Sequence, residues 1–346
     1  MLTVKLEQCI LYLTPYLIGE VKILGDKKMR GVKIVGTGMC MPKYILTNEE
    51  LSSFIDTSDE WIAQRTGIRQ RRIVTDENTI DLSVKAAKEA TEGIDPLEID
   101  LIIVGTVSPH QVIPSVACSV QAQLGATNAM AFDISAACSG FIYGSKIAVE
   151  AIRCGSAKKA LVIGAEVLSK VVDWSDRGTC ILFGDGAGAV LYEQTDVNKI
   201  LAFDVGSNGM LGQTLSLENQ AQNNPLIKNE YSPSFIKMDG RAVYRFAVNV
   251  VPISIKKALE KAQVNIDEIK LFVLHQANER IISSVAKNLN VDLNLFFKNL
   301  DKYGNTSGAS IPIALHEAKS NLKNGDKIVL TGFGGGLTWG SIVVQW

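Results

Sequence analysis

Short apolar runs alternate with amphipathic segments along most of this chain, and this alternation constrains its fold more than any other feature. Apolar runs of strand length are found at Leu101–Val107, Ala129–Ile134, Lys159–Ala165, Ala187–Tyr192, Leu271–Leu274 and Lys327–Thr331. Segments typical of helices are found at Thr79–Thr91, Ser115–Leu124, Ser139–Arg153, Val243–Ala262, Glu279–Leu289 and Ile311–Leu322. Strands and helices that alternate in this way predict an α/β fold with helices layered on sheets.

The two halves of the chain share a weak similarity. Pro96–Val104 resembles Asn265–Val273, and a helical pattern follows each copy. A serine–glycine pair opens a later helix in each half, at Ser139–Gly140 and at Ser307–Gly308. If the halves superpose, Cys138 and Asn305 lie near equivalent strand-to-helix turns. Two unrelated strand–helix–strand stretches also look alike, so the residues alone leave both interpretations open.

Charge and cysteine usage exclude several classes of function. The formal net charge of the 346 residues is -1, which argues against wholesale nucleic-acid binding and leaves room only for a local anion site. No CxxC pair and no Cys/His cluster has metal-ligand spacing, so we expect no metal site. The scattered cysteines fit free thiols in a reducing cytoplasm: Cys9, Cys40, Cys118, Cys138, Cys154 and Cys180.

The first residues contain an apolar run that is unsuited to a membrane span. Cys9–Gly19 is short for a span and is interrupted by Pro15, and no clear cleavage site follows it. A strand-like run begins at Gly31, just after Met29. We therefore expect no stable membrane association, and we expect Met29 to be the natural start, with residues 1–28 as an upstream extension. Mass spectrometry of the protein made in its own host would check this.

We expect the apolar run Ala129–Ile134 to be a buried core strand. Cys138 lies between this strand and a helical pattern, in Asp133-Ile134-Ser135-Ala136-Ala137-Cys138-Ser139-Gly140-Phe141. At a helix N-terminus, free N–H groups and the positive end of the helix dipole favour a thiolate. The small neighbours leave room for a substrate. Two interpretations remain open from this segment, a nucleophile and a small buried core cysteine.

Two further polar residues follow apolar runs. His275 comes directly after Leu271–Leu274, at the carboxyl end of a strand, where α/β sheets favour ligands. Asn305 lies in the turn 304–310 before a helix, and it is either a turn residue or a side chain that enters a pocket. The glycines of 332–336 lack the lysine of a phosphate-binding loop, so we interpret them as allowing backbone N–H groups to approach a carbonyl.

The segment 61–72 combines Trp61 with several arginines. In a nearly neutral chain this indicates an anionic ligand, for example the adenine and phosphates of a nucleotide. An exposed, solvated basic loop is the alternative, and it is the one we favour for Arg71 and Arg72. Trp174 and Arg177 form a second pair of the same kind.

Five motifs occur in order along the chain: DTSDEWIAQRTGIRQRRI (56–73), DISAACSGF (133–141), HQAN (275–278), GNTSGAS (304–310) and FGGGLTWGS (333–341). Together they resemble the β-ketoacyl-acyl carrier protein synthase III family of the thiolase superfamily, over about residues 29–346. The resemblance implies a thiolase-like, five-layered αβαβα fold from two duplicated halves. Residues 29–200 would hold the nucleophilic cysteine, and residues 201–346 the histidine and asparagine. It also implies a homodimer.

The same resemblance implies a multifunctional acyltransferase that initiates fatty acid biosynthesis. Cys138 would attack an acyl-CoA, and the N–H groups of Cys138 and Gly335 would form the oxyanion hole. Malonyl-acyl carrier protein would then lose CO2, while His275 and Asn305 stabilise the enolate oxygen. The products would be 3-oxoacyl-acyl carrier protein, CoA and CO2. CoA and acyl carrier protein thioesters are substrates here, so no cofactor is implied.

The binding residues also follow from the resemblance. Trp61 and Arg177 match positions that clamp the CoA adenine, and Arg65 matches one near its phosphates. The acyl carrier protein would dock on a basic surface made by Arg245, Asn278, Arg280 and Lys287. Ile113 falls where the acyl pocket can carry a bulkier aromatic residue, so we expect tolerance of primers somewhat longer than acetyl.

Related classes of enzyme would carry different catalytic residues at some of these positions. A thiolase needs a second cysteine near the C-terminal glycine motif, but the last cysteine is Cys180. An elongating synthase would have a histidine at Asn305. Chalcone-synthase-like enzymes share the Cys–His–Asn set, so malonyl-CoA as extender stays open. Two alternatives of function remain, a related acyltransferase of secondary metabolism and a non-catalytic acyl-CoA-binding protein.

Overall fold

The computed structural model describes residues 30–219, 221–229 and 233–346. The expectations for Cys9–Gly19, for residues 1–28 and for a start at Met29 lie outside the described residues. Within the described part, strands and helices alternate as the sequence predicts. No helix of this part is long and apolar enough to cross a membrane.

The first sheet has five strands in the order β1 (Gly31–Cys40), β7 (Gly186–Thr195), β6 (Lys159–Glu166), β4 (Leu101–Gly105), β5 (Met130–Ile134). β4 pairs in parallel with both β5 and β6, and all of its residues are buried. The prediction that Ala129–Ile134 is a core strand is wrong, because β5 is the edge strand and Met130 is 63% exposed. An apolar run indicates a strand but does not show whether a neighbour pairs on both sides.

The second sheet has four strands in the order β11 (Ile269–Leu274), β12 (Lys327–Gly334), β13 (Thr338–Gln345), β8 (Ile200–Ser207). β12 extends past its predicted end at Thr331, because Gly334 still pairs with Thr338 in a hairpin with β13. Sequence reasoning missed β13 and β8. Each contains only a short apolar run, Ile200–Phe203 in β8 and Ile342–Val344 in β13, next to glycine and polar residues, and neither run was assigned as a strand.

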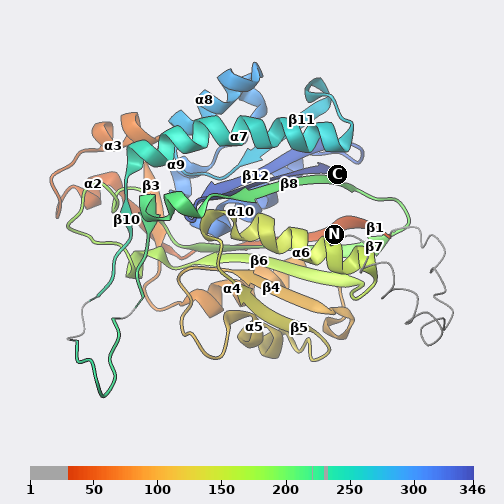
Figure 1. The fold of residues 1–346 in the computed structure, drawn as a ribbon, viewed down its shortest axis with the longest axis horizontal. Coiled ribbons are helices and arrows are strands. Elements are labelled where there is room, and N and C mark those ends of the chain that lie inside the picture. Colours follow the sequence, from red (N-terminus) through yellow and green to blue (C-terminus); the bar gives the residue numbers. More distant parts are fainter. Residues whose placement is uncertain (1–29, 220, 230–232) are drawn as a thin grey trace, which may run out of the picture.

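Helices and sheets stack in five layers (Figure 1). α4 (Thr79–Ala90) and α5 (Val116–Leu124) cover the outer face of the first sheet. α7 (Gly240–Ala262), with α8 (Glu279–Leu289) beside it, covers the outer face of the second. α6 (Gly140–Cys154) and α10 (Ser310–Ala318) lie between the two sheets. This confirms the predicted αβαβα arrangement.

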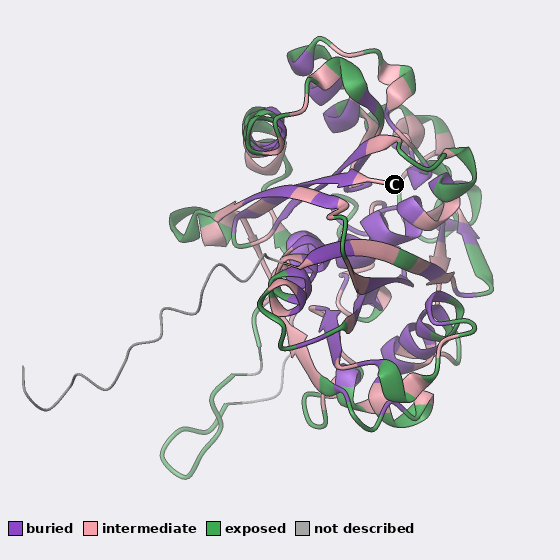
Figure 2. Cartoon of the chain, turned by 90° about the vertical axis from the view of Figure 1, so that its right-hand side faces the viewer, coloured by how far each residue is buried: buried purple, intermediate pink, exposed green. Residues whose placement is uncertain are grey.

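The central layer is held by apolar side chains from both sheets. Phe141 of α6 and Ile311 of α10 are fully buried in one cluster with Val162 of β6 and Leu330 of β12. Full burial of a side chain of this size contributes about 1.5–3 kcal/mol. Figure 2 shows the buried residues concentrated along the sheets and the two central helices.

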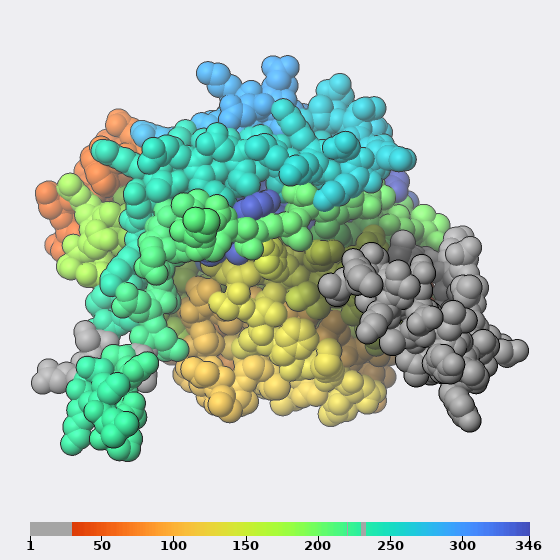
Figure 3. All heavy atoms as spheres, viewed as in Figure 1, coloured from red at the N-terminus to blue at the C-terminus, as the bar shows by residue number. Residues whose placement is uncertain are grey.

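Short elements complete the fold: α2 (Asn48–Leu51), α3 (Asp59–Thr66), α9 (Leu300–Tyr303), β2 (Tyr44–Thr47), β3 (Gln70–Ile73), β9 (Leu215–Ser216) and β10 (Lys237–Met238). β2 pairs with β3, and β9 pairs with β10. Residues 221–229, between β9 and β10, are exposed and project from the body of the molecule (Figure 3). This agrees with the loop-rich segment that the glycines, asparagines and prolines of residues 208–240 indicate.

Arg71 does not belong to a solvated basic loop, contrary to the interpretation favoured from the sequence. It lies in β3 and is fully buried. Its guanidinium donates hydrogen bonds to the side-chain oxygen of Asn48 at 2.8 Å and to the backbone carbonyl of Ile181 at 2.7 Å. Burial lowers its pKa to about 10. These acceptors explain how a guanidinium is tolerated inside the protein.

Two glycines let a turn of each half press against the sheet of the other half. A Cβ atom at Gly164 of β6 would lie 2.1 Å from the carbonyl oxygen of Gly308, in the 3-10 turn η7 (Ser307–Ala309). A Cβ atom at Gly334 of β12 would lie 2.7 Å from the Cβ of Cys138, in the 3-10 turn η2 (Ala137–Ser139). These close approaches bring the two turns together at the centre of the molecule.

Candidate active site

Cys138, His275 and Asn305 line one pocket of about 930 Å³. Cys138 lies in η2 directly before α6, and Asn305 lies two residues before the start of η7, which α10 follows. His275 follows the last residue of β11. In both turns one residue adopts a left-handed conformation, Ala137 with φ 45° and Ser307 with φ 47°. The two halves thus present similar turns to a shared cavity. The end of β11 positions His275, and the turns before α6 and α10 position Cys138 and Asn305.

The Cys138 thiol is buried, and this reverses the expectation that its position would lower its pKa. Burial raises the pKa of Cys138 to about 12, and this outweighs the lowering effect of the Ser307 side chain and of the backbone N–H groups of Cys138 and Gly335. A helix N-terminus stabilises an anion by about 0.3–1 kcal/mol at the surface and by up to about 2 kcal/mol in partly buried sites. Loss of the water shell of a thiolate costs more. In the free protein the group is therefore a thiol.

His275 is buried and neutral. Burial lowers its pKa to about 3, and no carboxylate of the described residues forms an ion pair with it. Its backbone N–H donates to the Thr331 carbonyl at 2.8 Å, and Phe333 packs edge-on against its ring with the centroids 5.1 Å apart. A neutral imidazole in this place acts as a hydrogen-bond donor or acceptor rather than as a cation.

The proton of His275 is assigned from its neighbours. Nδ1 of the ring lies 2.6 Å from the Ser310 hydroxyl oxygen, which also accepts a hydrogen bond from the Gln276 N–H at 3.4 Å. Among the described residues, the Ser310 hydroxyl has no other acceptor for its proton, so we assign this proton to the hydrogen bond with Nδ1. Nδ1 is then the acceptor, and Nε2 carries the proton as a donor.

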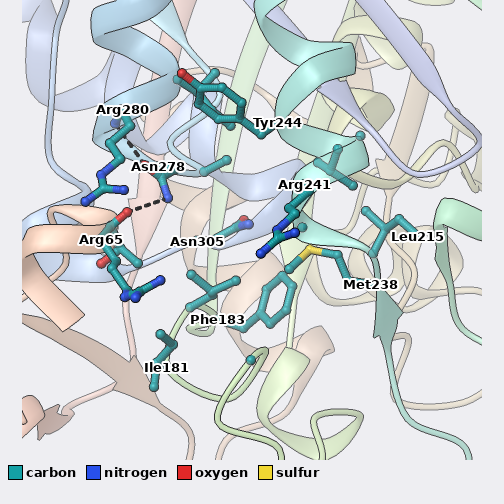
Figure 4. A pocket seen from close by; sticks show the side chains of 18 of the residues that line it. Arg65, Ile181, Phe183, Leu215, Met238, Arg241, Tyr244, Asn278, Arg280 and Asn305 are labelled. Carbon is teal, nitrogen blue, oxygen red and sulfur yellow. Dashed lines mark hydrogen bonds between the residues drawn. The ribbon is translucent and has the colours of Figure 1, made fainter. Parts of the chain in front are cut away.

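Asn305 directs its amide nitrogen toward the pocket because its oxygen is already used. Oδ1 accepts a hydrogen bond from the Ser307 N–H at 2.8 Å. Backbone hydrogen bonds to Leu182 and Gly184, at 2.8 Å and 3.0 Å, hold the residue in place. Among the labelled side chains of Figure 4, Asn305 lies at the centre of the cavity. Two neutral donors, Nε2–H of His275 and the amide of Asn305, are therefore available in the pocket that Cys138 lines.

Arginines dominate the mouth of the pocket: Arg65, Arg177, Arg241, Arg245 and Arg280. The guanidinium carbons of Arg65 and Arg177 lie 4.6 Å and 4.8 Å from the ring centre of Trp61. Of the described residues that line the pocket, none is an aspartate or a glutamate. An opening of this kind attracts phosphate groups, which guanidinium groups bind in bidentate fashion.

Sequence reasoning missed Arg241, which lines the pocket near Met238 and Leu215 (Figure 4). It stands four residues before Arg245 on α7, so that both arginines share one helix face. This four-residue spacing is the sequence signal that could have placed Arg241 beside Arg245 at the arginine-rich entrance of the pocket.

Asn278 and Arg280 are partly used within the fold. The Asn278 side chain accepts the Arg280 N–H as the N-cap of α8, and it donates to the Arg65 carbonyl at 3.0 Å. The Arg280 guanidinium donates to the Gln64 carbonyl at 2.6 Å. Both residues still line the pocket, whereas Lys287 is exposed further along α8 and does not.

Ile113 does not line the pocket of its own chain, unlike the acyl-pocket position expected for it. Its side chain is 86% exposed, in the loop between β4 and α5. The neighbouring Val112 is 82% exposed. The family resemblance selected Ile113 as an acyl-pocket residue. It could not predict the direction of the Ile113 side chain, because the conformation of the loop determines that direction.

Comparisons with known proteins agree with this geometry. Family models described as 3-oxoacyl-[acyl-carrier-protein (ACP)] synthase III and as its C-terminal part match residues 132–209 and 259–346. A relative named β-ketoacyl-[acyl-carrier-protein] synthase III from Clostridium acetobutylicum is 52% identical over 323 residues, covering 92% of this chain and 99% of the relative. The chain belongs to the β-ketoacyl-acyl carrier protein synthase III family.

Solved structures give the same result for the fold of this synthase III family member. The crystal structure of 3-oxoacyl-[acyl-carrier-protein] synthase III from Aquifex aeolicus matches with a TM-score of 0.86 and 48% identity, covering 91% of this chain and 100% of that one. The priming β-ketosynthase of a polyketide biosynthetic pathway matches with a TM-score of 0.85 and 34% identity, covering 92% and 96%.

Proposed function

We propose that this chain initiates fatty acid synthesis by condensing an acyl-CoA primer with malonyl-acyl carrier protein. The observation that carries the proposal is that Cys138, His275 and Asn305 line one cavity with an arginine-rich mouth. A sulfur nucleophile, two neutral donors and an anion-binding entrance are the parts that this decarboxylative Claisen condensation needs. The substrates are thioesters that bring their own reactive groups, so the reaction needs no cofactor.

In the first half-reaction, Cys138 takes the acyl group. Its sulfur attacks the carbonyl carbon of the acyl-CoA thioester, and CoA leaves as the thiol. The backbone N–H groups of Cys138 and Gly335 both lower the pKa of the Cys138 thiol, which supports their role as the oxyanion hole. The pantetheine of CoA enters past Trp61, Arg65 and Arg177, whose ring and guanidinium groups suit an adenine and its phosphates.

In the second half-reaction, malonyl-acyl carrier protein loses CO2 and leaves negative charge on its thioester oxygen. Nε2–H of His275 and the amide of Asn305 stabilise this enolate oxygen. Because both donors are neutral and weakly acidic, they hold the charge without protonating the carbanion. The carbanion then attacks the acyl–Cys138 thioester, and the 3-oxoacyl product leaves on the carrier protein.

The partners and the assembly follow from the surface. Arg245, Arg280 and Lys287, on α7 and α8, offer a basic surface to an acidic carrier protein. In the described residues, β5 has no strand on its outer side, and exposed Ile113 lies nearby in sequence. A homodimer would cover this apolar surface. Ile113 does not line the pocket of its own chain, so it could line an acyl pocket only in the second subunit of the dimer. We place the enzyme in the cytoplasm, with its substrates.

Ser310 positions the donor in this scheme. Replacement of Ser310 by alanine removes the hydroxyl that donates to Nδ1 of His275, so Nε2 loses its fixed proton. We expect condensation to decrease by about 2- to 13-fold, because a net hydrogen bond contributes about 0.5–1.5 kcal/mol, and we expect acylation of Cys138 to be unchanged. Single-turnover rates of the two half-reactions measure this. Ser310→Thr should restore condensation, and an equal decrease in both steps would contradict the assignment.

A second candidate function is priming of a secondary-metabolite pathway. The structural similarity to the priming β-ketosynthase of a polyketide pathway is the observation that favours it. Both functions use the same half-reactions and differ in the primer and in the carrier that receives the product.

A panel of substrates tests the proposed function and separates these candidates. Acetyl-, butyryl- and octanoyl-CoA are each combined with malonyl-acyl carrier protein or with malonyl-CoA, and products are identified by mass. We expect 3-oxoacyl-acyl carrier protein from acetyl and butyryl primers, and little product from malonyl-CoA. Absence of an acyl adduct with every primer would contradict the function. Strict use of acetyl would contradict the expected primer tolerance, and preference for octanoyl would favour the second candidate.

A further inference from the structure

The arginines at the mouth of the pocket differ in how far their guanidinium groups are already used. The guanidinium groups of Arg65 and Arg177 both lie against the ring of Trp61. The Arg280 guanidinium donates two hydrogen bonds to the Gln64 carbonyl, at 2.6 Å and 3.1 Å. Contacts within the chain therefore already hold these three guanidinium groups in the free protein.

Arg241 lines the same pocket, and its guanidinium is free. It lies in the first turn of α7, and Figure 4 shows its side chain pointing from that helix into the cavity. Its guanidinium forms no hydrogen bond, ion pair or ring contact with any described residue. The nearest carboxylate along the chain, Asp239, instead accepts the backbone N–H groups of Arg241 and Ala242, at 3.0 Å each. The positive charge of Arg241 is therefore available to a ligand.

Arg245 also has no such partner among the described residues, but it lies at a different place. It lines both the pocket and a groove of about 470 Å³ on the outer side of α7, together with Leu211, Phe246 and Ile253. Arg241 does not line this groove. Arg245 therefore faces a partner that docks on the surface, whereas Arg241 faces a group that enters the cavity.

The chemistry of the two half-reactions favours a phosphate as this group. A guanidinium bound to the malonyl carboxylate would stabilise the charged reactant more than neutral CO2 and would slow the decarboxylation. A phosphate keeps its negative charge in every step, and guanidinium groups bind phosphate oxygens in bidentate fashion. Both substrates of the proposed function carry one, because CoA and the acyl carrier protein hold their thioesters on the same 4'-phosphopantetheine arm.

Two apolar side chains beside Arg241 suit the part of the arm next to this phosphate. Met238 stands three residues before Arg241, pairs with Leu215 across β9 and β10, and lines the pocket together with it. In the arm, the carbon next to the phosphate-bearing carbon carries two methyl groups. Apolar side chains bind methyl groups by removing them from water. The wall of the cavity near Arg241 thus combines a free cation with an apolar surface, as this end of the arm requires.

We infer that Arg241 binds the phosphate of the phosphopantetheine arm, the charged group that acyl-CoA and malonyl-acyl carrier protein share. The inference rests on the proposed function, because it names the part of both substrates that α7 recognises. Arg241 contacts no reacting atom, so it acts on substrate binding and not on the chemical steps. Trp61 and Arg177 suit the adenine of CoA, and Arg245 suits the carrier protein. Arg241 serves both substrates.

Small thioesters that differ only in the phosphate test this assignment. S-acetyl-4'-phosphopantetheine and S-acetylpantetheine are compared by the acylation of Cys138, followed by intact mass in single turnovers at increasing thioester concentration. The parent protein should half-saturate at about 10-fold lower concentration of the phosphorylated thioester, the lower end for a hydrogen bond to a charged group. Arg241→Gln should lose this preference. Its maximal rate should stay at the parental value, because the lost interaction binds reactant and transition state alike.

Matched variants separate this effect from a structural defect. Arg241→Lys keeps the charge but not the planar fork, so it should keep part of the preference. Arg245→Gln removes an arginine one helical turn away, and it should keep the full preference while the KM for malonyl-acyl carrier protein rises. Because the Arg241 guanidinium contacts no described residue, its loss should leave the thermal unfolding temperature unchanged.

The second half-reaction tests whether the arm of the carrier protein uses the same site. Protein acetylated on Cys138 is mixed with malonyl-4'-phosphopantetheine or with malonylpantetheine, and release of CO2 is measured. Arg241→Gln should lose the preference for the phosphate here as well, and its KM for malonyl-acyl carrier protein should rise about 10-fold at unchanged kcat. A preference lost only in the acylation step would mean that Arg241 binds the phosphates of CoA alone, which contradicts the inference.

The outcomes are distinct for the two proposals. If the parent forms no adduct on Cys138 with any thioester, the proposed function fails. The inference alone is wrong if the acylated parent does not distinguish the two acetyl thioesters. It is also wrong if Arg241→Gln keeps the parental preference, or loses efficiency equally with both thioesters, while the proposed function stands.

Discussion

Replacement of Cys138 by alanine is expected to abolish both acyl transfer and condensation. The sulfur is the nucleophile that carries the acyl group between the two half-reactions, and Cys138 is the sole cysteine among the described residues that line the pocket. Without it no covalent intermediate forms. Intact mass after incubation with acetyl-CoA should show the acetyl adduct on the parent protein and none on Cys138→Ala, and 3-oxoacyl product should fall below detection.

Cys180→Ala is the matched control. Cys180 is also fully buried, but it does not line the pocket. This variant loses the same atom from the core and should still carry the adduct. An adduct on Cys138→Ala, or loss of the adduct in the control without loss of the fold, would mean that the nucleophile has been assigned to the wrong residue.

Replacement of His275 by alanine is expected to spare acylation and to reduce decarboxylation by about 100- to 1,000-fold, the effect of removing one oxyanion donor. The ring is neutral at every pH above its pKa of about 3, so it serves as a donor and does not ionise Cys138. The adduct should therefore form at the parental rate. Release of CO2 from malonyl-acyl carrier protein, followed in single turnovers, measures the second step.

A shape control accompanies this variant because His275 is buried and its loss leaves a cavity beside Phe333. His275→Gln fills more of that space and retains an N–H donor, so it should recover part of the decarboxylation. Thermal unfolding of both variants checks the fold. If His275→Ala blocked acylation in a folded protein, the separation of roles between Cys138 and His275 would be wrong.

Much of the fold was predictable where one local signal decided it. The spacing of apolar residues located α8 at Glu279–Leu289 without error, and the run at Leu101 identified β4. β8 was missed although it begins with the apolar run Ile200–Phe203, because a run of four residues next to polar and glycine residues is a weak signal. It also placed β5 in the core, because pairing with neighbours depends on residues far away in the chain.

The candidate site was likewise predictable from the sequence only in part. Its members were predictable because Cys138, His275 and Asn305 each follow a strand or precede a helix, and because their motifs resemble one family. Their ionisation was not. The sequence indicated an activated thiol at a helix N-terminus, but the structure buries the sulfur and raises its pKa to about 12. Desolvation depends on everything that surrounds a group, and no local motif contains that information.

The sequence alone determined the α/β class, because this depends on local periodicity. Through the resemblance of its motifs to one family, it also indicated the αβαβα fold and the three candidate catalytic residues. Only the tertiary structure decided that the Arg241 guanidinium has no partner among the described residues, that Arg71 is buried and that Ile113 faces away from its own pocket. Those facts depend on how two halves of the chain pack against each other. Packing of this kind brings together residues more than a hundred positions apart and sets their exposure to water.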